Sequence, residues 1–472
     1  MEEARYKFSY KWIVLSVVAI GTLMATLDAG MVRIALPHLS SVFQVGPNTV
    51  VWVLLVYLLI CTGLMLTLGR AADTFGRKRL YTLGLVIFSL GLGLCALAQS
   101  FIQLVIFRLI QAVGAAMVMA IGDAILTASF PSKERGRALG IMGAVIGAGL
   151  LSGPALGGIL LDFLDWRSIF YLRLPLGVVG AIMAWVLLKQ QVPSGQKRKF
   201  DLPGAATLFV ALACLFLALN QGQSLGWFQP WVVALGVMVI LFAFLFVLFE
   251  RRAEHPVLDL RLFLNRLFSA ASGSHSLVYM ATEMVGFLLP FLLIQAMSFS
   301  ASLSGLLMAT IPAWRLVLSP LSGRLSDKLG TLFFCSSGFV MVSAGIFLLT
   351  GLGLDASVVD IFLRLSVVGI GMGLFVSPNN SAIMGSVPGD KLGTASAMVA
   401  TLRQAGTATG VAIAGTVFAA SQLSHGALLE SQELSQEMVT KLSIVAGFGD
   451  ATLVALIVAG IGLVTSLLRG KR

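Results

Sequence analysis

The segment GRAADTFG at residues 69–76 recurs as GRLSDKLG at residues 323–330, with glycine, arginine, aspartate and glycine at the same positions. The second copy begins 254 residues after the first. PSKERG at 131–136 matches PGDKLG at 388–393 at an offset of 257, and several glycines that follow match at that same offset. Matches in one order at nearly one spacing indicate that the chain contains two copies of one structural unit.

The composition around these segments is strongly apolar. Of the 472 residues, 58% are hydrophobic and 11% are charged, and the mean hydropathy is +0.95. Soluble domains have about 25% charged residues, so a set of soluble, disordered or nucleic-acid-binding domains is excluded. The net charge of +11 indicates basic cytoplasmic loops, because Lys and Arg are retained on that side of a membrane. The four cysteines lie inside apolar stretches and are interpreted as core residues, not a disulfide or metal framework.

The sequence predicts an all-α membrane protein with fourteen spans, since each apolar stretch has the roughly 20 residues that a bilayer requires. These spans lie near residues 12–36, 49–69, 80–99, 102–129, 137–161, 169–189, 203–221, 230–249, 267–296, 303–322, 331–351, 357–378, 393–420 and 449–468. The duplication makes spans 1–6 equivalent to spans 9–14. We therefore expect six-helix bundles over 12–189 and 267–468, with a linker carrying two additional transmembrane helices over 190–266. The connection at 421–448 is expected to be a loop or an amphipathic surface helix.

The loops predict the orientation. Basic residues such as Arg77, Lys78 and Arg79 follow the even-numbered spans, whereas the opposite loops hold little beyond Arg167 and Lys441. Both termini are therefore expected in the cytoplasm. Two six-span halves with a site between them are typical of one large class of secondary transporters.

Several motifs carry a family resemblance. GRAADTFGRKR (69–79) resembles the signature between spans 2 and 3 of the major facilitator superfamily, and RLIQAVGAA (108–116) resembles its span-4 motif. GAGLLSGPALGG (147–158) is similar to its span-5 antiporter motif. LDAGMVRIALP (27–37) and LRQAGTATGVA (402–412) resemble the fourteen-span drug:proton antiporter subfamily. This resemblance implies an efflux antiporter that works by alternating access.

The chain departs from that pattern at three positions. Arg33 stands where the subfamily usually has Asn, Arg173 precedes Leu-Pro where it usually has Asn-Val-Pro, and Ala120 replaces a usual Pro. These departures place the subfamily's usual hydrophobic-cation substrate in question.

The resemblance implies a set of residues that gate the transporter. Gly69 and Gly76 are expected in tight turns, and Pro154 is expected to kink its helix. For the loop, a role as topology anchor only remains open, as does packing only for the glycines of span 5. The expected gating residues are Gly69, Asp73, Gly76, Arg77, Arg108, Gly153, Pro154, Gly157 and Arg403.

Acidic residues inside spans are candidates for proton coupling, because each costs about 2.5–3.5 kcal/mol at mid-membrane. Asp28 and Glu283 are 255 residues apart and occupy equivalent places in the first helix of each bundle. Asp123 is the third candidate. A buried carboxyl binds and releases a proton as its surroundings change. The alternative is that these acids form fixed ion pairs with arginines.

Embedded arginines are candidates for substrate binding, because a guanidinium offers a planar set of donors to a carboxylate or phosphate. Arg33, Arg173 and Arg315 exceed what the family resemblance explains, and Arg315 lies near mid-membrane. Trp314 and Phe287 are candidate aromatic walls of the same site. The alternative is that these arginines pair only with the embedded acids.

No nucleophile triad, metal-ligand spacing or phosphate loop is found, so we expect no enzymatic activity, no metal and no cofactor. The expectation is a proton-coupled secondary transporter, an efflux antiporter of an amphipathic organic anion, acting as a monomer in the cell membrane. Its partners are its small-molecule substrate, protons and lipid, with no nucleic acid. The alternatives are a multidrug exporter of lipophilic or cationic compounds and a transporter of a lipid-like substrate.

Overall fold

The computed structural model describes residues 2–131, 134–190, 202–252, 260–388, 392–430 and 434–469. Within them, fourteen helical segments are long and apolar enough to cross a membrane, as the sequence predicts. The first bundle and the linker contain α1 (Glu2–Val42), α2 (Pro47–Val50), α3 (Trp52–Phe75), α4 (Arg77–Ala96), α5 (Phe101–Ser129), α6 (Arg135–Phe163), α7 (Ser168–Tyr171), α8 (Leu174–Leu187), α9 (Leu202–Leu225) and α10 (Pro230–Arg252). The second bundle contains the 3₁₀ turn η1 (Leu260–Leu264), α11 (Arg266–Pro290), the π-helical turn η2 (Phe291–Ala296), α12 (Ala301–Met308), α13 (Thr310–Leu329), α14 (Thr331–Thr350), α15 (Val358–Gly385), α16 (Leu392–Glu430) and α17 (Gln436–Leu467).

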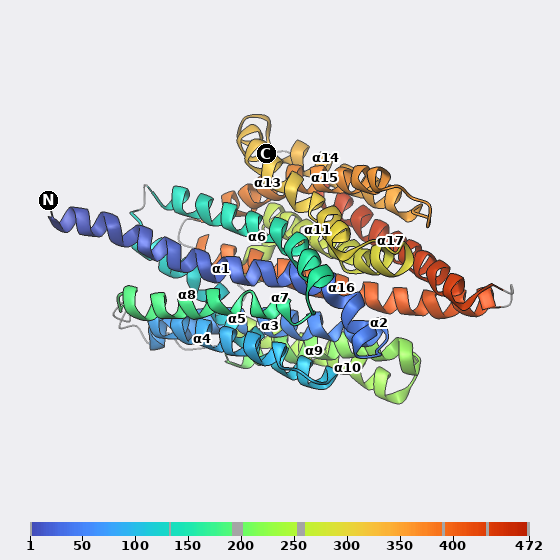
Figure 1. Ribbon diagram of the computed structural model, residues 1–472. Helices are drawn as coiled ribbons and strands as arrows, with labels where there is room; N and C mark the ends of the chain where they lie inside the picture. The colour runs from blue at the N-terminus through green and yellow to red at the C-terminus, as the bar shows by residue number, and fades with distance from the viewer. Residues whose placement is uncertain are drawn as a thin grey trace.

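The helices form two groups that lie side by side. In the first, α4 packs on α5 and α8, and α1 packs on α5 and α6; in the second, α14 packs on α15 and α17, and α11 packs on α16 and α17. Figure 1 shows α13, α14 and α15 along one side of the molecule and α4, α9 and α10 along the other, with α1 and α6 between them.

The duplicated segment forms the same turn in both halves. Gly76 joins α3 to α4 with φ of 97°, and Gly330 joins α13 to α14 with φ of 88°. A positive φ in this range strongly favours glycine, which explains why both copies of the duplicated segment end in glycine. Gly69 is a correction: it lies inside α3, not in a turn, where a side chain would approach Ala120 of α5.

Equivalent helices of the two bundles approach closely through glycine. A Cβ on Gly114 of α5 would lie 2.7 Å from Cα of Phe88 on α4. A Cβ on Gly371 of α15 would lie 2.6 Å from the backbone nitrogen of Val342 on α14. In lipid, where no hydrophobic force joins two helices, such close contact supplies much of their association.

The connection expected at 421–448 is shorter than the sequence suggests. α16 continues to Glu430 and α17 begins at Gln436, so most of the segment belongs to two extended helices. The hydroxyl of Ser435 accepts a hydrogen bond from the Met438 N–H and caps α17. Helices can continue here because polar residues are tolerated once they leave the hydrocarbon region.

The inserted helices contact both bundles. α9 packs on α3 of the first bundle and α16 of the second. The amide of Asn220 on α9 donates to the Asn48 carbonyl oxygen of α2 at 2.6 Å, and the Thr416 hydroxyl of α16 donates to the Leu219 carbonyl oxygen of α9 at 2.8 Å. The insert therefore bridges the two bundles along one side.

The bundles meet closely where α6 ends, and α6 is less crowded where it begins. At the end of α6, Gly158 lies against the Ala301 carbonyl of α12 so closely that a Cβ would overlap it. Towards the start of α6, a Cβ on Gly136, Gly140 or Gly143 would have no atom within 4 Å.

Candidate functional site

A cavity of about 220 Å³ lies between the two bundles. Its lining comes from α1, α3, α5 and α6 of the first bundle and from α11, α12, α13, α15 and α16 of the second. Six charged side chains take part: Asp28, Arg33, Arg108, Glu283, Arg315 and Arg403. Four arginines against two carboxylates give the lining a net charge of +2 when all six are ionised.

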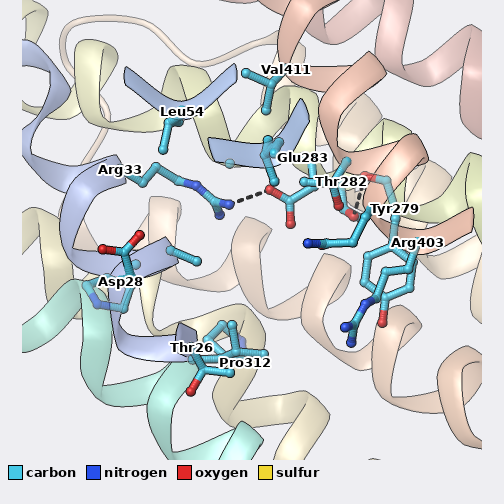
Figure 2. A pocket seen from close by; sticks show the side chains of 18 of the residues that line it. Thr26, Asp28, Arg33, Leu54, Tyr279, Thr282, Glu283, Pro312, Arg403 and Val411 are labelled. Atoms are coloured by element: carbon cyan, nitrogen blue, oxygen red, sulfur yellow. Dashed lines mark hydrogen bonds and ion pairs between the residues drawn. The ribbon is translucent and has the colours of Figure 1, made fainter. Parts of the chain in front are cut away.

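One ion pair crosses the cavity between the bundles. Nη2 of Arg33 on α1 lies 2.5 Å from Oε2 of Glu283 on α11, and the two side chains are 20% and 19% exposed. Figure 2 shows the two groups pointing toward each other across the open space. Because each partner belongs to a different bundle, relative movement of the bundles changes the distance between them.

The other acid lies in a closed network within the first bundle. Nη1 of Arg108 donates to both carboxylate oxygens of Asp28 at 2.9 Å, and Arg173 donates to the same carboxylate. The amide of Gln111 donates to Asp28 at 2.9 Å. Asp28, Arg108 and Arg173 are all 0% exposed. A carboxylate held by two guanidinium groups is strongly stabilised in its ionised form.

Two arginines of the lining have no ion-pair or hydrogen-bond partner among the described residues: Arg315 on α13 and Arg403 on α16. The guanidinium carbon of Arg315 lies 5.6 Å from the ring centre of Tyr279, a cation–π contact. Figure 2 shows Arg403 beside that ring. Both arginines remain available to an anion in the cavity.

Four of the predicted residues lie outside the lining. Arg173 is fully buried on Asp28, and Phe287 is fully buried against Phe291, with ring centres 5.7 Å apart. Trp314 faces α15, where its Cβ would lie 3.0 Å from a Cβ on Gly369. Asp123 is exposed on α5, where the charge of Arg403 acts on it. Arg173, Trp314 and Phe287 thus lie outside the cavity lining in this structure, because the rotation of each helix turns them into its bundle.

The predicted gating residues lie at helix contacts. A guanidinium N–H of Arg77, at the start of α4, donates to the Ala124 carbonyl oxygen of α5 at 3.2 Å. Gly153, Pro154 and Gly157 are buried on α6, and a Cβ on Gly157 would lie 2.9 Å from Cα of Met31 on α1. The side chain of Asp73 lies outside the described part of the chain.

Sequence reasoning missed two tyrosines of the lining. Tyr57 on α3 lies under Arg108, with 4.6 Å between the guanidinium carbon and the ring centre, and Tyr279 lies under Arg315. Arg403 was assigned to gating by resemblance, yet it lines the cavity. The sequence spacing could have indicated Tyr279 as a lining residue, because Tyr279 lies four residues before Glu283 and therefore on the same face of α11.

A two-bundle helical fold with a charged cavity between its halves defines the class of secondary transporters that work around a central site. The chain belongs to the Major Facilitator Superfamily, whose family model matches residues 18–411. Its homologues are transporters of that superfamily. The riboflavin transporter RibZ of Clostridioides difficile (strain 630) is 34% identical over 87% of this chain and 89% of its own length.

A second relative is the multidrug resistance protein Stp of Mycobacterium tuberculosis (strain CDC 1551 / Oshkosh), 31% identical over 86% of this chain and 76% of its own length. Among solved structures, a bacterial homolog to the human lysosomal transporter Spinster, inward-facing and unoccupied, superposes with a TM-score of 0.71. That alignment covers 98% of this chain and 97% of the other at 16% identity, so it supports the fold alone.

Proposed function

We propose that the protein is a proton-coupled transporter of an amphipathic organic anion in the cell membrane. It works by alternating access, with cytoplasmic termini, as a member of the fourteen-span subfamily. The observation that carries this proposal is the Arg33–Glu283 ion pair, which crosses between the bundles inside a cavity of net charge +2.

The proton site in this proposal is Glu283 and not Asp28. Protonation of Asp28 would leave two fully buried arginines without a counter-charge, which costs several kcal/mol. Glu283 has a single arginine partner and reaches the cavity, so a proton from the cavity can exchange with it. Asp123, exposed on α5, remains the weaker candidate because it does not line the cavity.

The anion preference rests on the arginines that have no acidic partner. The alternative expectation is that all surplus arginines pair with embedded acids. It agrees with Arg33, which pairs with Glu283, and with Arg173, which pairs with Asp28. It does not account for Arg315, which faces the cavity without such a partner among the described residues. Arg403 also faces the cavity without an ion pair among the described residues, although its charge acts on Asp123. The apolar remainder of the lining, such as Leu54, Met308 and Ile311, suits the organic body of an amphipathic substrate.

Two other substrate classes are supported by the relatives. A multidrug resistance protein favours the alternative of lipophilic or cationic compounds, for which Glu283 would be the counter-charge. A riboflavin transporter favours a flat neutral heterocycle, for which Tyr57 and Tyr279 offer stacking surfaces. The net positive lining argues against the cation.

The test is reconstitution in liposomes with an imposed pH gradient and three matched probes. These are the anion 8-anilinonaphthalene-1-sulfonate, the uncharged N-phenyl-1-naphthylamine with the same rings, and the cation ethidium; riboflavin is the fourth compound. We expect saturable, gradient-dependent flux of the sulfonate, about tenfold slower in Arg315→Gln. The flux should be unchanged in Arg252→Gln, an exposed arginine at the end of α10. A clear preference for ethidium would reject the anion proposal.

A further inference from the structure

We propose that Arg469, just after the end of α17, is the centre of a binding site inside the second bundle for a small monovalent inorganic anion such as chloride. The neighbours of Arg469 in this site are Ser274, His275, Cys335 and Asn379, and none of the five residues lines the central cavity. Occupancy of the site therefore does not depend on the transported substrate proposed above.

The guanidinium of Arg469 is buried among polar groups of other helices. The residue is 5% exposed. Its Nη2 donates to the Ser274 hydroxyl of α11 and to the side-chain oxygen of Asn379 on α15. The Cys335 thiol of α14 is a further neighbour. All three neighbours are neutral and fully buried, so the cation is surrounded by groups that carry no opposite charge.

No carboxylate offsets this buried cation. Arg469 forms no ion pair among the described residues, and burial lowers the pKa of its guanidinium because no acidic group compensates the desolvation. Arg108 of the first bundle is just as deeply buried, but it lies against the Asp28 carboxylate. An unpaired charge in a protein interior is strongly unfavourable, so a bound anion would stabilise the fold around Arg469.

Three buried N–H groups of the cluster have no acceptor. Nε and Nη1 of Arg469 have no hydrogen-bond partner within the described part of the chain, and neither has Nε2 of His275. The oxygen of the Asn379 amide accepts from Arg469, so its nitrogen is the donor in the 3.3 Å contact with Nδ1 of His275. Nδ1 is therefore unprotonated, and the ring carries its proton on Nε2. The cluster thus offers donors and a positive charge, the two properties that an anion requires.

The surroundings select a small anion of single charge. Ser274, His275 and Asn379 are at most 1% exposed, and the ring centre of Phe375 lies 5.7 Å from the guanidinium carbon of Arg469. A lipid phosphate is too bulky for so enclosed a place. A divalent anion such as sulfate would leave a buried negative charge, whereas chloride balances one guanidinium.

An anion in this site would stabilise the second bundle, because Arg469 ties the end of α17 to α11 and α15. The test follows thermal unfolding of the purified full chain in detergent, with sodium chloride replacing sodium gluconate at constant ionic strength. Binding to the folded state alone raises Tm with the logarithm of anion concentration. We expect about 2 °C for each tenfold increase in chloride once the site fills. Bromide and nitrate should act as chloride does.

Arg469→Gln should abolish this response. In gluconate the variant should unfold at the wild-type Tm or above, since it lacks a buried charge without a partner, and in saturating chloride the order should reverse. Arg469→Lys should keep the response with about tenfold weaker affinity, because an ammonium group retains the charge but not the planar set of donors.

Two control variants separate this site from other places where chloride could bind. Arg266→Gln removes an exposed arginine that donates to the Leu468 carbonyl oxygen at 2.8 Å, and it should respond as the wild type does. Arg315→Gln, in the central cavity, should also keep the response. A response that is lost in Arg315→Gln and kept in Arg469→Gln would place the chloride in the central cavity and overturn the proposal.

Three other results would also overturn it. One is a wild-type Tm that does not differ between chloride and gluconate. Another is a wild-type advantage over Arg469→Gln that is equal in both salts, which would give Arg469 a structural role only. The third is a rise in Tm with added phosphatidylglycerol but not with chloride, which would assign the site to a lipid headgroup. Crystals grown in bromide should show an anomalous scattering peak beside Nε and Nη1 of Arg469, and its absence would count equally against the site.

Discussion

The carboxylate of Asp162 accepts a hydrogen bond of 2.9 Å from the backbone N–H of Ala301, so a residue of one bundle caps a helix of the other. The same carboxylate accepts a 2.8 Å bond from the N–H of Ser302. Asp162 ends α6, and Ala301 begins α12, where unpaired N–H groups and the helix dipole favour a negative charge. The closed end of the molecule is thus held partly by a contact that must break whenever that end opens.

Asp162→Ala is expected to shift the protein toward the state open at this end. Loss of a carboxylate that accepts hydrogen bonds at a helix N-terminus costs about 1 kcal/mol, which changes the ratio of the two states about fivefold. Spin labels at Leu164→Cys and Leu306→Cys would report the separation, because the four native cysteines are buried and should not react. Asp165→Ala, an exposed residue paired with Arg167, is the control. An unchanged distance distribution in Asp162→Ala would contradict the role.

Gly158→Val should favour opening of the same end by steric means. A Cβ at Gly158 would overlap the Ala301 carbonyl, whereas a Cβ at Gly140 of the same helix would meet nothing within 4 Å. We therefore expect a longer distance between the labels in Gly158→Val and no change in Gly140→Val. Identical distance distributions in the two variants would show that the contact between α6 and α12 accommodates a larger side chain at residue 158.

Asp28→Asn is expected to destabilise the fold more than any other single change in the cavity. It leaves Arg108 and Arg173 buried without a carboxylate, at a cost of about 3–5 kcal/mol. Thermal unfolding in detergent should show a clear fall in Tm, much smaller in Glu283→Gln. Arg173→Leu added to Asp28→Asn should restore part of the loss, and an additive loss would count against the network.

Arg403→Gln should weaken transport of the sulfonate probe about tenfold through its KM, as one charge-assisted contact of about 1.4 kcal/mol would. The effect should match that of Arg315→Gln, because both side chains face the cavity without an ion-pair or hydrogen-bond partner among the described residues. Initial rates at several probe concentrations separate KM from kcat. A change confined to kcat would return Arg403 to the gating role that its family resemblance implies.

The fold was predictable because its determinants are local. A bilayer requires long apolar helices, so hydropathy identified the spans, and Gly76 and Gly330 marked the same turn in both halves. The cavity was less predictable because helix rotation decides which side chains meet. Arg173 and Arg315 look alike in sequence, yet one is buried on Asp28 and the other faces the cavity.

The sequence also could not predict how the surroundings of the two acids differ. Asp28 and Glu283 occupy equivalent helices of the duplication and line one cavity, as their spacing suggests. Their chemistry differs because of partners distant in sequence: Arg108 and Arg173 for one, Arg33 for the other. The duplication explains where the acids lie, whereas side chains outside the matched positions, such as Arg173, determine the partners of each acid.

The inserted helix α9 covers one of the two lateral boundaries between the bundles, so these two boundaries differ. It lies over the junction of α3 and α16 and hydrogen-bonds to both halves through Asn220 and Leu219, so lipid tails are excluded there. The opposite boundary, between α6 and α13, has no such cover among the described residues. The two lateral boundaries therefore present different surfaces to the bilayer, an asymmetry that a symmetric duplication alone would not possess.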